Sequence, residues 1–445
     1  MDTRMLRYYT QELSYMREMG AEFATAFPKI AARLSLDPTE VADPYVERLL
    51  EGFSFLAARL RLKLHSVFPR FTQHLLEVLY PHYLTPTPSM AIVQLQPSLT
   101  EGSLAAGFVV PHGTTLRGQI PRGEVTACQF RTAHDVTLWP VEISEARYTP
   151  FAADLPLNTL GLTEPVQGVL RLKVRTPAPF TFQQIALDRL NIFLAAGDEV
   201  ALKLYELILG SGLGVLVNPP ARPLPWFEWL GREAIQPVGF ARDQALIPYT
   251  TRSFSGYRLL HEYFAFPERF RFVELTGLRK ALSRHAGDEI ELAIPLARGD
   301  ATLGTMVDKS GFALHCTPAI NLFSRRADRI HVTDQQAEHH VVVDRTKPMD
   351  FEVYSVERVV GYSEGLEAEQ EFRPFYSSFD SDSRLPAHGY FSIRREPRAL
   401  SEKQRRDGPR SSYMGTEVSL SLVDPREAPY SGTLRQLGVD VVVSN

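Results

Sequence analysis

The chain has 445 residues, of which 44% are hydrophobic and 22% are charged, with a formal net charge of −4. This composition is typical of a globular protein with two to four well-buried domains, and the weak acidic balance gives no electrostatic attraction toward nucleic acid or an anionic membrane. No apolar run approaches the ~18 residues of a membrane span, and the N-terminus lacks the apolar core of a signal peptide, so we expect a cytoplasmic chain without membrane insertion.

Residues 1–84 predict a helical N-terminal region with three helices. The first ends before Pro28, the second begins at Asp43 and Pro44, and the third runs from about Pro69 to Tyr80. An aspartate can cap a helix, and proline suits the first helical turn, where a missing N–H group costs nothing. The proline-rich stretch LTPTPS, residues 84–89, predicts the end of this region.

The second helix, residues 43–64, is apolar on two sides. One side has the regular spacing of an ordinary surface helix: Val46, Leu49, Leu50, Phe53, Leu56, Ala57, Leu60 and Leu64. Phe55, Ala58 and Leu62 project from the opposite side, among charged residues. Packing of the regular apolar face leaves this second side uncovered, so we expect another segment to pack over it.

After residue 85 the apolar period changes from 3.6 to 2, which predicts antiparallel β-structure. Short apolar runs occupy residues 91–96, 108–118 and 136–143, and a helix is expected near residues 198–209. The proline-rich stretch 218–226 predicts a boundary between two β-rich domains, residues 85–222 and 223–445. The expected fold class is therefore α+β, a helical N-terminal region followed by β-rich domains with a few helices.

Residues 239–275 hold an unusual density of aromatic side chains, which indicates either a core or a permanent interface. A short helix is expected to begin near Gly256. Its two apolar sides follow helical spacing. We expect one side to face the core (Tyr257, Leu260 and Phe264) and the other to face a partner (Leu259, Tyr263 and Phe266).

The sequence contains no recognisable catalytic, cofactor or metal-binding motif. The GSGLG stretch, residues 210–214, follows a helix instead of a strand, so it predicts a turn and not a phosphate-binding loop. His339 and His340 are adjacent in an expected strand and so point to opposite faces. The arginine-rich stretch 394–410, which includes Arg405 and Arg406, is either a hairpin loop or a surface that docks to an acidic protein.

Several stretches together resemble the TssF family of type VI secretion system baseplate subunits. They include YYTQELSYMREMGAEFATAFPKIAARL, DPYVERLLEGFSFLAARLRLKL, LLEVLYPHYLTPTPSM, IPYTTRSFSGYRLLHEYFAFPERFRF and LHCTPAINLFSRRAD. The resemblance covers nearly the whole chain. Full-length family members continue beyond residue 445, so the chain is similar to a subunit that lacks its C-terminal portion.

This resemblance implies a structural role without catalysis. Two copies of such a subunit join one TssG in a wedge, wedges surround the VgrG spike hub, and TssK and TssE attach the wedge to the membrane complex and the sheath. It implies a location at the cytoplasmic face of the inner membrane, and helices of a partner subunit over Phe55, Ala58 and Leu62. A carbohydrate-binding or adhesin-like β-module and a hydrolase are the alternative functions. The first requires an exposed aromatic platform, and the second requires convergent carboxylates or a nucleophile in a pocket.

Overall fold

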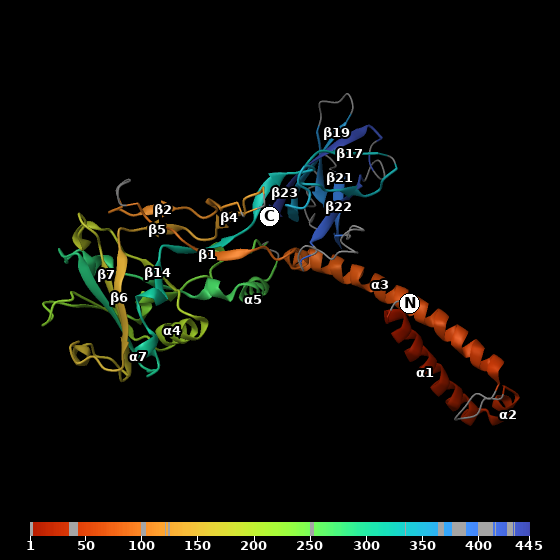
Figure 1. Ribbon diagram of the computed structural model, residues 1–445, viewed down its shortest axis with the longest axis horizontal. Coiled ribbons are helices and arrows are strands. Elements are labelled where there is room, and N and C mark those ends of the chain that lie inside the picture. Colours follow the sequence, from red (N-terminus) through yellow and green to blue (C-terminus); the bar gives the residue numbers. More distant parts are fainter. Residues whose placement is uncertain are drawn as a thin grey trace, which may run out of the picture. The chain divides into compact units, whose positions relative to one another are not determined.

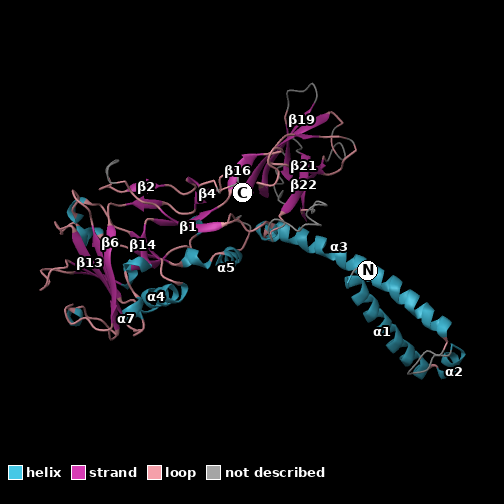
Figure 2. Ribbon diagram, viewed as in Figure 1, coloured by secondary structure: helices cyan, strands magenta, loops and turns pink. Residues whose placement is uncertain are grey.

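The computed structural model describes residues 3–34, 43–98, 104–120, 122, 125–249, 253–333, 335–363, 369–375, 389–398, 413, 415–424, 430 and 432–445. The chain divides into two compact units, Met1–Leu84 and Thr85–Asn445. The described residues of the first unit form helices, and strands predominate in the second (Figures 1 and 2). The predicted α+β fold class is confirmed. None of the described helices combines the length and apolar character that crossing a membrane requires.

The first unit contains α1 (Thr3–Ala26), α2 (Pro28–Ala31), η1 (Ala32–Leu34), α3 (Pro44–Leu79) and η2 (Pro81–Leu84). Helix α3 begins as predicted, because the Asp43 carboxylate accepts a 2.8 Å hydrogen bond from the Tyr45 amide and Pro44 lies in the first turn. The helix does not end before Pro69, however. It continues for 36 residues, so the two helices predicted over 43–64 and 69–80 are one. An internal proline removes one backbone hydrogen bond, and here the helix continues past that local loss.

Helices α1 and α3 form an antiparallel hairpin, which Figure 1 shows as two ribbons side by side. Three polar contacts join residues far apart in the sequence: Tyr8 with His65 (2.7 Å), Glu12 with Arg61 (2.6 Å) and Arg17 with Glu47 (3.1 Å). The partner's number falls along α3 as the number rises along α1. Ser54 and Ala58 of α3 are fully buried, and their small side chains allow the two helices to approach closely.

The first core of the second unit lies between two sheets and α4 (Asp198–Ser211). The five-stranded sheet has the order β10 (Glu228–Gly231), β9 (Gly214–Asn218), β13 (Glu289–Leu296), β7 (Gly168–Arg175) and β6 (Glu142–Thr149). The four-stranded sheet has the order β11 (Ile235–Pro237), β12 (Phe272–Leu275), β8 (Leu190–Leu194) and β14 (Phe312–Leu314). Helix α4 confirms the helix predicted near residues 198–209, and GSGLG makes the turn into β9.

The predicted boundary at residues 222/223 falls inside this five-stranded sheet and is wrong. Strand β9 precedes the proline-rich stretch 218–226, yet it pairs with β10 and β13, which both follow it. The stretch is a connection fixed on the surface of one unit, because the Arg222 guanidinium donates to Asp154 at 3.0 Å and pairs with buried Glu291. Prolines end strands by removing backbone donors, and they do so within a domain as well as between domains.

A second four-stranded sheet has the order β1 (Met90–Gln94), β15 (Cys316–Ile320), β4 (Gln129–Thr132) and β3 (Thr115–Arg117). Nearby, β2 (Phe108–Val110) pairs with β5 (Val136–Leu138). The shorter helical elements of the unit are η3 (Leu157–Thr159), η4 (Phe182–Gln184), η5 (Arg232–Ala234), η6 (Arg242–Gln244), α5 (Ser255–Ala265), η7 (Pro267–Phe270), α6 (Arg279–Leu282), α7 (Leu303–Met306) and η8 (Lys309–Gly311). Strand β1 lies at an edge of its sheet.

The second large core lies on an eight-stranded sheet. Its order is β16 (Phe323–Arg326), β23 (Leu434–Ser444), β19 (Glu352–Ser363), β20 (Gln370–Pro374), β21 (Gly389–Pro397), β22 (Thr416–Val423) and β18 (His339–His340), with β17 (Ile330–His331) also paired to β23. Strand β23 includes most of the C-terminal stretch LGVDVVVSN. Its Val439, Val441 and Val443 are fully buried at alternate positions, so one face of this strand is core.

Candidate interaction surfaces

Helix α3 exposes a continuous apolar row that we call the outer stripe: Leu49, Phe53, Leu56, Leu60 and Leu64. Each of these side chains is 57–75% exposed. Their spacings of three and four residues place them on one side of the helix. Among the described residues, Phe71, Leu75 and Leu79 continue the row toward the helix C-terminus and are also exposed. A contiguous apolar surface of this kind is typical of a docking site.

The structure corrects the sequence analysis on which side of α3 is covered. Ala58 is fully buried, Leu62 is half-buried, and the Phe55 ring lies 6.4 Å from the Tyr9 ring of α1. The side that carries Ala58 and Leu62 therefore packs on α1 of the same chain, and Phe55 contacts Tyr9 of α1 while it stays 38% exposed. The regular apolar face, interpreted as that of an ordinary surface helix, is the side left open.

Helix α5 is inverted, with charged residues inside and aromatic residues outside. Arg258 and Glu262 are buried, one helical turn apart, and Arg269 of η7 is buried beside them. Glu262 pairs with both guanidinium groups, and its Oε1 also accepts hydrogen bonds of 2.9 Å and 3.0 Å from the amides of Leu246 and Ile247. We call these three side chains the buried ion cluster. Burial, and next the charge of Arg258, lower the pKa of Arg269 to about 9.

The buried ion cluster satisfies the backbone of the irregular segment 239–249. Arg258 donates to the carbonyls of Phe240 and Ala241, and Arg269 donates to those of Gly239 and Gln244, at distances of 2.6 to 3.3 Å. Buried carbonyls without partners would each cost about 1–3 kcal/mol. The charged side of α5 therefore faces inward, because apart from the single turn η6 this segment has no sheet or helix to supply donors.

His134 contacts the same segment, and we expect it to make the second unit less stable in acid. Its Nε2 lies 3.2 Å from the Gln244 carbonyl, and burial, then the charge of Arg269, lower its pKa from 6.5 to about 4. The unfolded chain therefore binds a proton more readily than the folded one between pH 6.5 and 4. Stability is expected to fall across this window as pH decreases, by up to about 3 kcal/mol from this group. Chemical denaturation of wild type and His134→Gln at pH 7 and pH 4.5 tests this. If wild type and His134→Gln lose the same stability between pH 7 and pH 4.5, the prediction is wrong. His340→Gln changes an exposed histidine and is the control, which should lose as much stability as wild type.

The outward side of α5, which we call the aromatic face, consists of Phe254, Tyr257, Leu260, Tyr263 and Phe264, all more than half exposed. The prediction that Tyr257, Leu260 and Phe264 face the core is wrong, because Arg258 and Glu262 occupy the inward side. Of the residues predicted to face a partner, Tyr263 is 56% exposed. Leu259 and Phe266 are half-buried, and Phe266 packs against a small core that includes Ile247 and Leu322.

The arginine-rich stretch 394–410 is described only as far as residue 398, so Arg405 and Arg406 lie outside the described residues. Arg394 donates to Glu338 at 2.7 Å on the surface. Arg395 is mostly buried, and burial lowers its pKa. Its guanidinium donates to three oxygens at 2.7–2.9 Å: the Val353 carbonyl, the Tyr354 carbonyl and the Thr416 hydroxyl. Arg395 thus joins β21 and β22 to β19 and is not available for docking.

The described part of the chain contains no group of three or more His, Cys, Asp or Glu side chains arranged to hold a metal ion. On β18, His339 is buried and His340 is exposed, so the two rings lie on opposite faces as predicted. The outer stripe and the aromatic face are therefore the surfaces with the clearest functional character.

Comparison with known proteins identifies the family. The family model described as "Type VI secretion system, TssF" matches residues 1–445. The chain belongs to the TssF family. A curated relative, type VI secretion system component TssF1 of Pseudomonas aeruginosa, is 49% identical over 446 residues, which cover 100% of this chain and 71% of the relative.

A solved structure agrees with this assignment. A chain of the TssK–TssF–TssG baseplate subcomplex of a type VI secretion system, determined by cryo-electron microscopy, matches with a TM-score of 0.65 and 28% identity. The match covers 90% of this chain and 68% of that chain. This TssF-family chain is a structural subunit of the secretion-system baseplate, as its sequence predicted.

Sequence reasoning missed the outer stripe as a docking surface. The residues were recognised as one apolar face of α3, but a face with regular spacing was interpreted as the one that packs on its own chain. A usable signal is the size of the side chains. Ser54 and Ala58 permit close helix packing, whereas Leu, Phe and Tyr side chains predominate on the open side.

Proposed function

We propose that this TssF-family chain scaffolds a baseplate wedge through the outer stripe and the aromatic face, which bind TssG and a second copy of the chain. The observation that supports this most directly is the direction of packing in α3. The hairpin buries the side with small residues and leaves five large apolar side chains exposed. A helix that is covered on one side and apolar on the other needs a further helix to complete a bundle.

The spacing of the outer stripe favours helices as the binding partner. Its intervals of four, three, four and four residues average 3.75, near the 3.6 residues of one helical turn, so the row stays on one side of α3 and can pack along a neighbouring helix. Partner helices with a similar apolar row would cover the stripe. This assignment replaces Phe55, Ala58 and Leu62 as the partner-facing residues of α3.

The aromatic face of α5 supplies a second contact of a different kind. Its five exposed side chains include no charged residue, and tyrosine and phenylalanine are enriched at the centres of protein interfaces. The buried ion cluster fixes the helix in this orientation, so the face is already formed before binding and needs little ordering. The outer stripe and the aromatic face are thus two preformed apolar surfaces, enough for one contact with TssG and one with a second copy of the chain.

The remaining partners follow from the family role. We propose TssK, TssE and the VgrG spike hub as further neighbours in the wedge, at the cytoplasmic face of the inner membrane. The basic residues Arg405 and Arg406 are proposed to dock to an acidic protein surface. The solved TssK–TssF–TssG subcomplex contains a protein similar to this chain together with TssK and TssG, which supports those two partners first.

Co-expression with TssG and TssK of the same secretion system, followed by mass measurement of the purified complex, tests the proposed function. A stable heteromeric complex is expected. If the chain is purified alone as a stable monomer in the presence of both subunits, the scaffold role is excluded. If complexes do form but Tyr263 stays exposed in all of them, the aromatic face is not an interface, and a carbohydrate-binding module becomes the better explanation for it.

The aromatic face can be tested separately with Leu260→Ala and Phe264→Ala. Because both side chains are exposed, each variant should change stability by no more than about 0.5 kcal/mol. Loss of a contact at the centre of an interface should instead weaken complex formation by about tenfold or more. A thermal melt beside a pull-down with TssG gives both values. A large drop in melting temperature without loss of binding would show that the face is part of the core.

A further inference from the structure

The outer edge of β1 carries unpaired backbone groups. Strand β1 pairs only with β15, with Gln94 opposite Cys316. The Leu95 amide donates to the His315 carbonyl at 2.9 Å, so the odd-numbered residues of this strand face β15. In an antiparallel pair the alternate residues point their backbone groups away from the partner strand. Those of Ile92, Gln94 and Gln96 therefore face outward, and no described residue pairs with their backbone.

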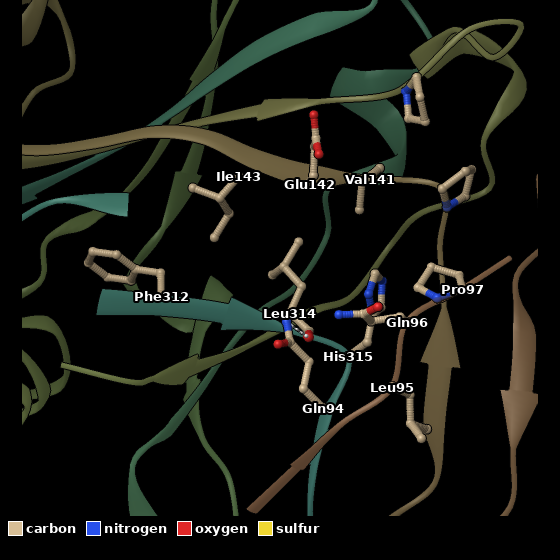
Figure 3. Close-up of a pocket in the computed structure, with 12 residues that line it drawn as sticks. Gln94, Leu95, Gln96, Pro97, Val141, Glu142, Ile143, Phe312, Leu314 and His315 are labelled. Carbon is tan, nitrogen blue, oxygen red and sulfur yellow. Dashed lines mark hydrogen bonds between the residues drawn. The ribbon is translucent and has the colours of Figure 1, made fainter. Parts of the chain in front are cut away.

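A cavity of about 360 Å³ opens at the end of this edge (Figure 3). Apolar side chains from three segments form its walls: Val141 and Ile143, Phe312 and Leu314, and Pro97. In Figure 3, Ile143 of β6 and Val141, just before this strand, point toward Leu314, while Gln96 lies beside His315. Sites for small ligands measure roughly 300–1,000 Å³, so this cavity lies at the small end of that range and has room for one large side chain.

His315 lines the cavity and has one ring N–H group available to donate. Its Nε2 accepts a 3.2 Å hydrogen bond from the Trp139 amide, so the proton of the neutral ring is on Nδ1. Burial lowers its pKa to about 4, so the ring is neutral near pH 7. No described residue accepts a hydrogen bond from Nδ1, although His315 lines the cavity.

His315 also has a φ of 57°, a left-handed conformation that costs a non-glycine residue about 1–2 kcal/mol. Local strain of this kind is concentrated at functional sites.

We propose that one extended strand of a partner baseplate subunit adds to the outer edge of β1 and places an uncharged, hydrogen-bond-accepting side chain in the cavity. The alternating outward backbone groups select a strand, because only an extended chain matches their spacing. The cavity selects an uncharged side chain. Its single carboxylate, Glu142, already binds Arg175 at the surface, so a charged side chain that entered the cavity would be buried without a partner. The His315 Nδ1–H selects a side-chain oxygen. The inference rests on the proposed function for the source of the strand.

Proline at position 94 tests the edge specifically. The Gln94 amide faces outward, so Gln94→Pro removes an N–H group that the β1–β15 ladder does not use, and proline is tolerated at such edge positions. Gln94→Ala is the matched control, because it also loses the side-chain bond to the Leu314 carbonyl but keeps the amide. We expect the affinity for co-expressed TssG and TssK to fall at least tenfold in Gln94→Pro and by less than threefold in Gln94→Ala.

Hydrogen exchange in the wild-type protein gives a second readout that requires no variant. The amides of Ile92, Gln94 and Gln96 should exchange at least tenfold more slowly in the complex than in the chain alone. If the complex forms but these amides exchange at an unchanged rate, the inference is overturned and the proposed function stands. The same holds if the Pro and Ala variants bind equally well. If no complex forms with the wild-type chain, both are overturned.

Discussion

Replacing Glu262 by alanine is expected to destabilise the second unit by about 3–5 kcal/mol. The carboxylate is fully buried, pairs with two buried guanidinium groups and accepts hydrogen bonds from the backbone amides of Leu246 and Ile247. Its removal leaves Arg269 as a buried cation without its counter-charge and leaves two buried amides without an acceptor. Breaking a buried ion pair by removing one partner typically costs this much, because the remaining charge is no longer compensated.

Urea denaturation at pH 7 measures this loss, with Glu268→Ala as the matched control. Glu268 lies nearby, but its side chain is 36% exposed and its oxygen is 3.8 Å from the Arg271 guanidinium. Pairs of this kind contribute about 0–1 kcal/mol. Glu262→Gln should lie between the two, since the amide retains one acceptor and loses the charge. Equal stability of Glu262→Ala and Glu268→Ala would show that the buried ion cluster does not hold α5.

Changing two residues of the outer stripe is expected to abolish most assembly while the hairpin stays folded. The double variant Leu56→Gln, Leu60→Gln keeps good helix formers at both positions and removes two large exposed apolar side chains. Interface side chains of this type contribute about 1–2 kcal/mol each, so the affinity for TssG should fall by roughly thirtyfold to a thousandfold. The isolated chain should also self-associate less than wild type, because its exposed apolar area is smaller.

The matched control changes two polar residues of the same helical turns, Arg59→Gln with Lys63→Gln. Both side chains are exposed, and neither lies on the outer stripe. Affinity from titration and particle size from light scattering, with and without TssG, compare the two double variants. If the polar control loses as much affinity as the stripe variant, charge at this part of α3 governs assembly and the apolar row does not.

The two expected results differ in what they test. The Glu262 variants test why α5 presents its aromatic face outward, and the outer stripe variants test what an exposed apolar face is for. A chain with an intact buried ion cluster and a disrupted outer stripe should fold normally and assemble poorly. A chain with the reverse combination should be less stable to urea while its outer stripe stays intact.

Local patterns in the sequence predicted most elements of this protein, and its resemblance to known proteins predicted its family. The 3.6-residue and 2-residue apolar periods predicted the helical first unit and the β-rich remainder, and Asp43–Pro44 predicted the start of α3. Both signals are local, since they depend on backbone geometry and on neighbours within one or two turns. The apolar spacing within residues 239–275 likewise predicted a helix that begins near Gly256, which is α5.

Which side of each helix is covered follows from tertiary packing and not from the sequence pattern. Two apolar sides of α3 are equivalent in a helical pattern, and the choice between them depended on the close approach that Ser54 and Ala58 allow to α1. The orientation of α5 depended on backbone carbonyls of residues 239–249, which lie outside the helix and accept hydrogen bonds from Arg258 and Arg269. The continuity of the sheet across residues 218–226 depended on pairing between strands that are distant in the sequence. Burial is a property of the surroundings of a side chain, so a pattern of residue types along one segment could not supply it.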